Sequence, residues 1–155
     1  MKPNIKKLLI CLAIPLAVGG LSALVTGGMS DYPMLNQPPL SPPGWLFPVV
    51  WTVLYLLMGY ASYRVLTSGA DKAQINNALR LYGLQLFVNF LWSPVFFGLQ
   101  WRLVAFFLLL LLWILIALTI RAFSAIDERA GDLLIPYLLW VTFAGYLNLA
   151  LYWLN

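Results

Sequence analysis

The sequence contains no histidine and a single cysteine, Cys11, among its 155 residues. Without histidine, the chain has no means of building His-ligated zinc or haem sites, or a Ser-His-Asp or Cys-His catalytic group. One cysteine excludes a disulfide within the chain. Because Cys11 lies in the first apolar run, we interpret it as a small packing residue. We therefore expect no bound metal and no resident cofactor.

Charged residues are also scarce. They make up 9% of the chain, whereas a soluble domain carries about 25%. Hydrophobic residues make up 63%, and the mean hydropathy is +0.88. So few charges would leave most of the surface apolar, and lipid is the solvent that tolerates such a surface. The net charge of +4 is small and forms no basic stripe, so we expect a membrane protein that does not bind nucleic acid.

Five apolar runs are long enough to cross a bilayer as helices, which takes about 20 residues each. These runs cover residues 8–28, 45–66, 79–99, 103–120 and 133–154. The basic start of the first run is typical of a signal peptide, but the run is long enough to span and no small-x-small cleavage site follows it. The sequence therefore predicts an all-α fold, a single membrane domain of five transmembrane helices over residues 1–155.

Lysine and arginine residues fall on one side of these five spans. Eight of the nine lie at the N-terminus or in the second and fourth connections, and only Arg102 lies on the other side. Basic residues concentrate on the cytoplasmic side of membrane proteins. We expect a cytoplasmic N-terminus, an external C-terminus and an external first connection, with insertion in a bacterial inner membrane.

The first connection, residues 29–44, is the longest. It cannot be helical, because it contains five prolines: Pro33, Pro38, Pro39, Pro42 and Pro43. It is either a stiff connector or a lid over the external mouth of the bundle. We favour the lid, because a simple connection needs only a few residues.

Polar and aromatic residues recur on one face of three predicted spans, and small residues recur on a fourth. The third span carries Tyr82, Gln85, Asn89, Trp92, Ser93 and Phe96 on this face; the second carries Pro48, Trp51, Thr52, Tyr55, Gly59 and Ser62; the last carries Pro136, Trp140, Ala144, Leu147 and Asn148; the first carries Gly19, Ala23 and Gly27. Polar groups are costly in lipid, so these faces should point inward. The fourth span is apolar all round, which predicts a position against lipid.

Two interpretations of the inward faces remain open. The polar and small residues are interhelical contacts, or the faces form a cavity in which Trp51, Trp92 and Trp140 converge on a flat ligand. We favour the cavity for the set as a whole. No carboxylate or lysine lies in mid-span, which argues against a proton-coupled transporter.

Three segments carry a family resemblance. They are PPLSPPG at 38–44 followed by WTVLY at 51–55, QLFVNFLWSPVFFG at 85–98, and PYLLW at 136–140 followed by Ala144 and YLN at 146–148. In this order they resemble the translocator protein family, also called tryptophan-rich sensory proteins or peripheral-type benzodiazepine receptors. The resemblance covers nearly the whole chain.

The resemblance implies a five-helix bundle, commonly a homodimer, with a pocket beneath the first loop. Family members bind porphyrins such as protoporphyrin IX and benzodiazepine-type ligands, and animal members bind cholesterol. Bacterial members are linked to tetrapyrrole regulation and stress responses, and some degrade protoporphyrin in light. The matching pocket positions are Tyr32, Pro42, Trp51, Tyr55, Asn89, Trp92, Ser93, Trp140 and Ala144. The two tryptophans tied to degradation match Trp51 and Trp140.

The chain departs from the family pattern in two places. Family loops often carry a lysine and a tryptophan where this loop has Gln37 and Leu40. The cholesterol motif needs a basic residue after an aromatic one, and none follows Tyr152. We therefore give sterol binding little weight.

Three functions follow from the resemblance. The preferred one is a membrane protein that binds a metal-free porphyrin or another flat apolar molecule between Trp51 and Trp140. The second is an enzyme that degrades protoporphyrin IX in light, with these two tryptophans as catalytic residues. The third is passive translocation of a porphyrin or sterol. We expect membrane lipid and a second copy of the chain as partners.

Overall fold

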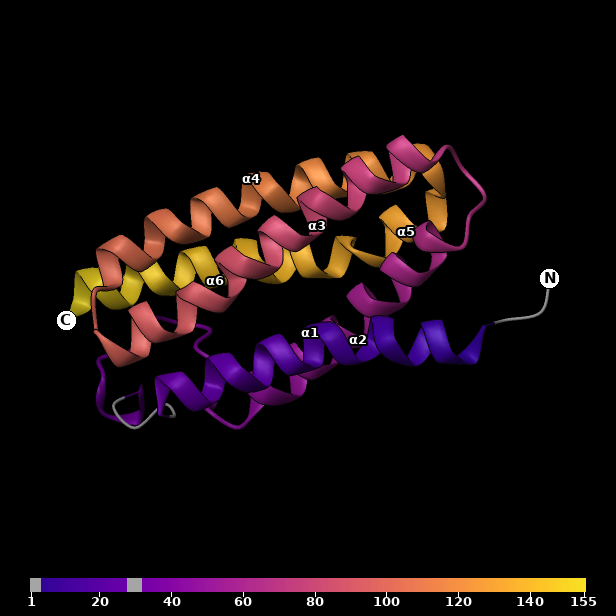
Figure 1. The fold of residues 1–155 in the computed structure, drawn as a ribbon. Helices are drawn as coiled ribbons and strands as arrows, with labels where there is room; N and C mark the ends of the chain where they lie inside the picture. The colour runs from indigo at the N-terminus through magenta and orange to yellow at the C-terminus, as the bar shows by residue number, and fades with distance from the viewer. Residues whose placement is uncertain (1–3, 28–31) are drawn as a thin grey trace.

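The structure is a computed structural model that describes residues 4–27 and 32–155. All regular secondary structure in these residues is helical, and five helical segments are long and apolar enough to cross a membrane. The elements are α1 (Ile5–Thr26), the 3-10 turn η1 (Tyr32–Met34), α2 (Leu46–Leu66), α3 (Lys72–Ser93), the π-helix η2 (Pro94–Gly98), α4 (Arg102–Ile126), α5 (Glu128–Leu133) and α6 (Ile135–Leu154). The all-α prediction is confirmed. The start of α1 and the end of α6 lie at opposite ends of the bundle, as five crossings require (Figure 1).

Three helices extend further than the apolar runs predict. α3 begins at Lys72 instead of residue 79, α4 continues to Ile126 instead of residue 120, and the last span begins with α5 at Glu128 instead of residue 133. Hydropathy marks only the part of a helix that suits lipid, whereas Ile75 and Ala78 are buried inside the protein before the third apolar run starts. Residues 28–31, at the junction of the first predicted span and the loop, lie outside the described residues.

The third span changes its helical form where proline enters it. Pro94 has no N–H to donate, and the amide of Leu99 donates to the carbonyl of Pro94 at 2.8 Å, five residues back. The resulting π-helix η2 buries Phe96 and Phe97. Local π-helices of this kind often occur at functional sites. The sequence predicted an uninterrupted helix to residue 99.

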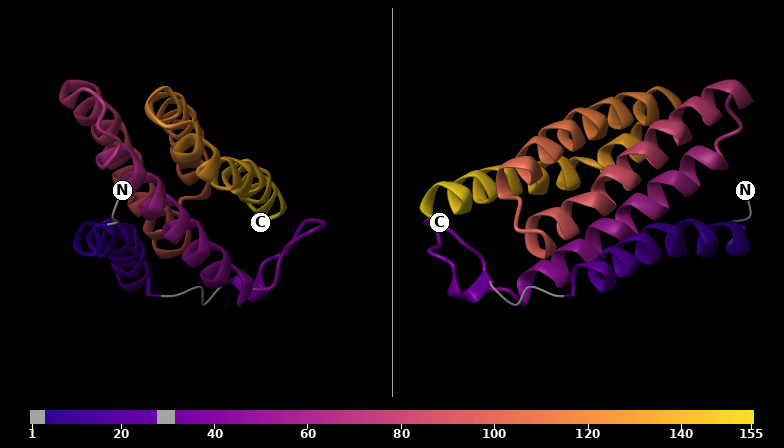
Figure 2. Two further views of the ribbon diagram at one scale, coloured as in Figure 1. Left: turned by 90° about the vertical axis from the view of Figure 1, so that its right-hand side faces the viewer. Right: turned by 60° about the vertical axis from the view of Figure 1, so that its left-hand side comes forward.

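The fourth span, predicted to lie mainly against lipid, keeps most of its surface exposed but packs along one face inside the bundle. α4 packs against both α3 and α6, and it buries Leu109, Leu112, Ile116 and Phe123 along one face. Figure 2 shows the three helices together in both views. An all-apolar helix suits protein and lipid surroundings equally, so its sequence pattern does not indicate which face packs inward.

The least buried span is α1, which packs chiefly on α2. Their backbones approach closely at Gly59, where a Cβ would lie 2.6 Å from the carbonyl oxygen of Cys11. The predicted small-residue ladder does not make this crossing. Gly19 faces the ring of Tyr55, and Gly27 ends the helix with φ of 79°. The two helices run side by side in Figures 1 and 2.

Candidate ligand cavity

The main cavity has a volume of about 440 Å³ and lies between α1, α2, α3 and η2, in the half of the bundle nearer the first connection. Its walls are formed by Leu16, Gly19, Gly20, Ser22, Ala23, Thr26, Phe47, Pro48, Trp51, Thr52, Tyr55, Asn89, Trp92, Ser93 and Phe97. Five of the predicted site residues are among them: Trp51, Tyr55, Asn89, Trp92 and Ser93. No lysine, arginine, aspartate or glutamate of the described chain lines this cavity.

Aromatic rings form two sides of the cavity. On α2, Trp51 stacks on Tyr55, with ring centroids 5.6 Å apart and an angle of 29° between the planes. On the opposite side, Phe97 of η2 meets the ring of Trp92 edge-on at 5.8 Å. Aromatic pairs in these geometries are rigid and mutually stabilising. These ring contacts therefore support the cavity walls on both sides.

Small and hydroxylated residues of α1 close the third side. The Ser22 hydroxyl donates to the carbonyl of Phe90 at 2.8 Å, and the Thr26 hydroxyl donates to Ser93 at 3.1 Å. These bonds fix the second half of α1 against α3. Gly19 leaves just enough room for the ring of Tyr55, because a Cβ there would collide with it.

The cavity opens between α1 and α2. Its lining residues Gly20 and Ala23 on α1, and Pro48 and Thr52 on α2, are exposed. All four lie within the two membrane-spanning helices. The opening therefore faces the lipid rather than the aqueous phase.

A buried chain of hydrogen bonds supports the cavity wall from behind. The hydroxyl of Tyr55 donates to Asn89 Oδ1 at 2.8 Å, and Asn89 Nδ2 donates to the hydroxyl of Tyr137 at 2.7 Å. Tyr137 in turn donates to Gln85 Oε1 at 2.7 Å. Gln85 Nε2 completes the series by donating to the carbonyl of Tyr82 at 2.9 Å. Each hydrogen bond in this series therefore has a defined donor and acceptor, and the series links α2, α3 and α6.

Tyr137, which supports the cavity wall from behind, is one residue that the sequence interpretation missed. It lies three residues before Trp140, on the same helical face as Val141 and Ala144, so its spacing already placed it inward. Phe47 and Phe97 were missed as well. The sequence indicated these two residues less clearly, because neither is among the residues predicted for the inward faces of the spans.

Three of the other four predicted site residues lie around a second, much smaller space of about 10 Å³. Tyr32, Trp140 and Ala144 line this space and not the main cavity, whereas Trp51 and Trp92 line both. Phe47 borders both spaces and contacts the ring of Trp140 edge-on at 5.9 Å. The structure therefore does not bring Trp51 and Trp140 together around one open cavity. Trp140 also has a buried Nε1 without a hydrogen-bond partner among the described residues.

The described part of the first connection folds over the end of this small space. The buried Tyr32 donates from its hydroxyl to the carbonyl of Pro42 at 2.7 Å, and Pro42 itself lines neither space. Burial raises the pKa of Tyr32 above its ordinary value, although Ser41 acts in the opposite direction. Gln37, at the first departure from the family pattern, donates to the carbonyl of Tyr32 at 3.0 Å. Leu40, at the second, is exposed with a positive φ of 70°.

Residues of α6 hold this connection from the other side. The hydroxyl of Tyr146 donates to the carbonyl of Pro39 at 2.7 Å. The backbone of Asn36 exchanges two hydrogen bonds with the side chain of Asn155, at 3.1 and 3.0 Å. A proline-rich segment held at both Tyr32 and Asn36 favours the lid interpretation over a simple connector.

Fold and site together define an integral membrane protein of five helical spans with an uncharged aromatic cavity that opens toward lipid. The profile of the TspO/MBR family matches residues 11–154. The chain belongs to this family.

Similar proteins come from bacteria and animals. The chain is 41% identical over 157 residues to the "Tryptophan-rich protein TspO" of Chlorobaculum tepidum, covering 100% of this chain and 99% of that one. It is 43% identical over 117 residues to the "Tryptophan-rich sensory protein" of Cereibacter sphaeroides, covering 76% and 72%. It is 38% identical over 141 residues to the "Translocator protein" of Bos taurus, covering 87% and 82%.

Proposed function

We propose that this protein binds a porphyrin, or another flat apolar small molecule, in the main cavity. The observation that carries the proposal is the composition of the walls: Trp51, Tyr55, Trp92 and Phe97 face a space of about 440 Å³ without a charged side chain. Small-molecule sites are typically cavities of about 300–1,000 Å³ with aromatic walls and a few polar groups. The affinity would come from ring contact and from removal of apolar surface from water.

The polar groups of the cavity are suited to orienting such a ligand. Asn89 is already held by Tyr55 and Tyr137, and Ser93 is held by Thr26. With no histidine in the sequence, a metal-free porphyrin suits the site better than a haem. The walls offer no cation to the carboxylates of protoporphyrin IX, so these groups would have to lie toward the end of the cavity nearest the membrane surface, where water can solvate them.

The biological setting is part of the same proposal. The charge distribution supports a bacterial inner membrane with the N-terminus in the cytoplasm and the first connection outside. The name of the sensory relative supports a receptor-like role, for which we propose tetrapyrrole regulation or a stress response. A homodimer is the assembly that we propose for this role.

Single tryptophan substitutions test the site. Protoporphyrin IX is titrated into the purified protein, and its affinity is measured from the change in Soret absorbance. W51F should weaken binding roughly threefold to tenfold, because one stacking partner is replaced by a smaller ring. W140F should bind like the wild type, because Trp140 does not line the main cavity. W113F, in a tryptophan that bonds to Thr142 away from both spaces, is the control.

The result separates two positions for the ligand. If W140F weakens binding as much as W51F, the ligand lies between Trp51 and Trp140, and the space of about 10 Å³ must open to admit it. If neither variant differs from W113F, the main cavity is not the porphyrin site.

Light-dependent degradation of the bound porphyrin is a second candidate function. Trp51 lies in the cavity wall and stacks on Tyr55, so two oxidisable side chains are in contact next to the ligand space. The excited porphyrin would pass one electron to dioxygen, and the resulting porphyrin radical cation and superoxide would combine, so that both oxygen atoms add to the ring that Trp51 holds in place. An enzyme should give one defined product and more than one turnover per protein, both reduced in W51F. A mixture of bleached products with less than one turnover would leave only binding.

Passive translocation across the membrane is the third candidate function. The opening between α1 and α2 would let a porphyrin or sterol exchange with the lipid, and the uncharged walls offer no group to couple that movement to an ion gradient. Uptake into proteoliposomes that is independent of any imposed gradient would support it. Uptake equal to that of protein-free liposomes would exclude it.

A further inference from the structure

A second hollow of about 370 Å³ lies between α2 and the α5–α6 segment, at the opposite end of the bundle from the main cavity. The residues that carry the argument are Leu57, Tyr60 and Arg64 on α2, and Arg129, Asp132 and Leu133 on α5. We propose that this hollow binds the zwitterionic headgroup of a membrane phospholipid of the phosphatidylethanolamine type. The proposal does not depend on the porphyrin site.

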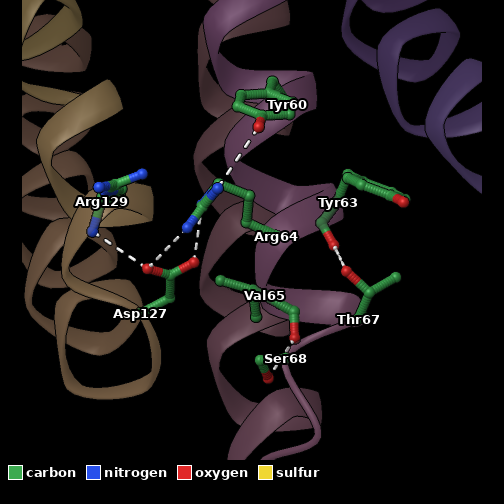
Figure 3. Close-up of polar contacts among 8 residues, drawn as sticks. All are labelled: Tyr60, Tyr63, Arg64, Val65, Thr67, Ser68, Asp127 and Arg129. Atoms are coloured by element: carbon green, nitrogen blue, oxygen red, sulfur yellow. Dashed lines mark hydrogen bonds and ion pairs between the residues drawn. The ribbon is translucent and has the colours of Figure 1, made fainter. Parts of the chain in front are cut away.

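The α2 wall of the hollow is fixed by an ion pair. Arg64 Nε lies 2.7 Å from Asp127 Oδ2, and a second nitrogen of the same guanidinium donates to Oδ1 at 3.4 Å. The guanidinium also lies 5.8 Å from the centroid of the Tyr60 ring. Asp127 accepts from the backbone N–H of Arg129 at 3.1 Å as well, so it joins α5 to α2 (Figure 3). The hollow therefore has its shape before any lipid arrives.

The charges of the hollow suit a zwitterion better than an anion. Because Asp127 neutralises Arg64, the lining retains one further cation, Arg129, and one anion, Asp132. Both are exposed, and Arg129 makes no ion pair within residues 4–27 and 32–155. A guanidinium is the preferred donor to a phosphate. The carboxylate of Asp132 would accept from the ammonium group of the same headgroup.

The surroundings of the hollow indicate a lipid rather than a water-soluble phosphate compound. Leu57 and Leu133 form an apolar floor. Leu56 on α2 and Leu139 on α6, on the outer surface of the two helices beside it, are 40% and 64% exposed. Arg64 lies in the last turn of α2, where a spanning helix reaches the headgroup level. A phospholipid would thus place its phosphate at Arg129 and its acyl chains along the leucines.

Native mass spectrometry of the purified protein tests this proposal, with phosphatidylethanolamine, phosphatidylglycerol and phosphatidylcholine added in turn. The wild type should retain phosphatidylethanolamine most strongly. R129Q should weaken that retention about tenfold, because a charge-assisted hydrogen bond is lost. D132N should lower the preference for phosphatidylethanolamine over phosphatidylglycerol. L57W, which fills the floor without changing the charge, should weaken retention of all three. R121Q, in an exposed arginine of α4 outside the hollow, is the matched control.

Several results would overturn the proposal. Equal retention of phosphatidylethanolamine by R129Q and R121Q would show that the hollow holds no phosphate. An unchanged lipid preference in D132N would show that Asp132 does not bind the ammonium group. A wild type that prefers phosphatidylglycerol would show only general attraction of anions. Phosphoethanolamine without acyl chains binding as tightly as the lipid would exclude a lipid site. Both charge variants remove exposed side chains, so thermal melting that matches the wild type excludes misfolding as the cause.

Discussion

The hydroxyl of Tyr55 donates a hydrogen bond of 2.8 Å to Asn89 Oδ1, and both residues line the main cavity. The bond joins α2 to α3 at the depth where the two helices form opposite walls. The Nδ2 of Asn89 in turn donates to the hydroxyl of Tyr137 on α6. The cavity wall is therefore supported by a helix that does not itself line the cavity.

We expect Y137F to destabilise the protein by about 1–3 kcal/mol, since it leaves a donor on Asn89 and an acceptor on Gln85 buried without partners. Y146F is the control, because the bond from Tyr146 to Pro39 is exposed. Thermal melting followed by circular dichroism in detergent measures both variants. Equal melting temperatures would show that the buried chain adds nothing to stability.

The crossing of α1 and α2 provides a second prediction. G59A should destabilise the bundle by about 1–3 kcal/mol, because the new methyl group meets the backbone of Cys11 and Leu12 and the helices must separate. G83A places a methyl group in open space on α3 and should be neutral or slightly stabilising. Thermal melting followed by circular dichroism in detergent measures both variants. A G59A protein as stable as G83A would mean that the two helices do not cross at this distance.

The raised pKa of the buried Tyr32 predicts that its contribution to the stability of the protein depends on pH. Its folded-state pKa is raised above the ordinary value of 10.0, chiefly by burial. A raised pKa means that the folded state retains the proton, so the stabilisation is complete below pH 10 and is lost as the pH rises through the folded-state value. The stability difference between wild type and Y32F should therefore be constant from pH 7 to 9 and shrink above pH 10.

Melting temperatures of the two proteins across this range test the pH prediction. Y152F, in an exposed tyrosine near the end of α6, is the control that should follow the wild type throughout. A difference that shrinks already between pH 7 and 9 would contradict the burial of the Tyr32 hydroxyl.

Much of the architecture follows from the sequence because its physical causes are local. Twenty apolar residues in succession have few stable states other than a spanning helix. The inward position of Gln85, Asn89 and Trp92 follows equally from the cost of polar groups in lipid. All three are buried. These predictions need no knowledge of which helix packs against which.

The parts that the sequence did not predict depend on pairs of helices. Gly19 and Gly59 both lie on α-helical faces with small residues, yet only Gly59 meets a helix backbone, because the angle between α1 and α2 decides where they touch. The position of Trp140 depends in the same way on Phe47, whose ring contacts it from α2 beside the main cavity. The apolar run that predicted α4 contains one polar residue, the buried Thr119, so the sequence indicated little about the contacts of this helix with α3 and α6.

The central claim is that a flat ligand occupies the cavity between α1, α2 and α3, and filling that cavity tests it most directly. Ala23 lines the cavity on α1, whereas Ala17 is exposed on the same helix and lines neither of the two spaces near the loop. In a Soret titration with protoporphyrin IX, A23W should bind about tenfold or more weakly than the wild type, and A17W should bind as the wild type does. Wild-type affinity in A23W, with both variants folded, would contradict the claim.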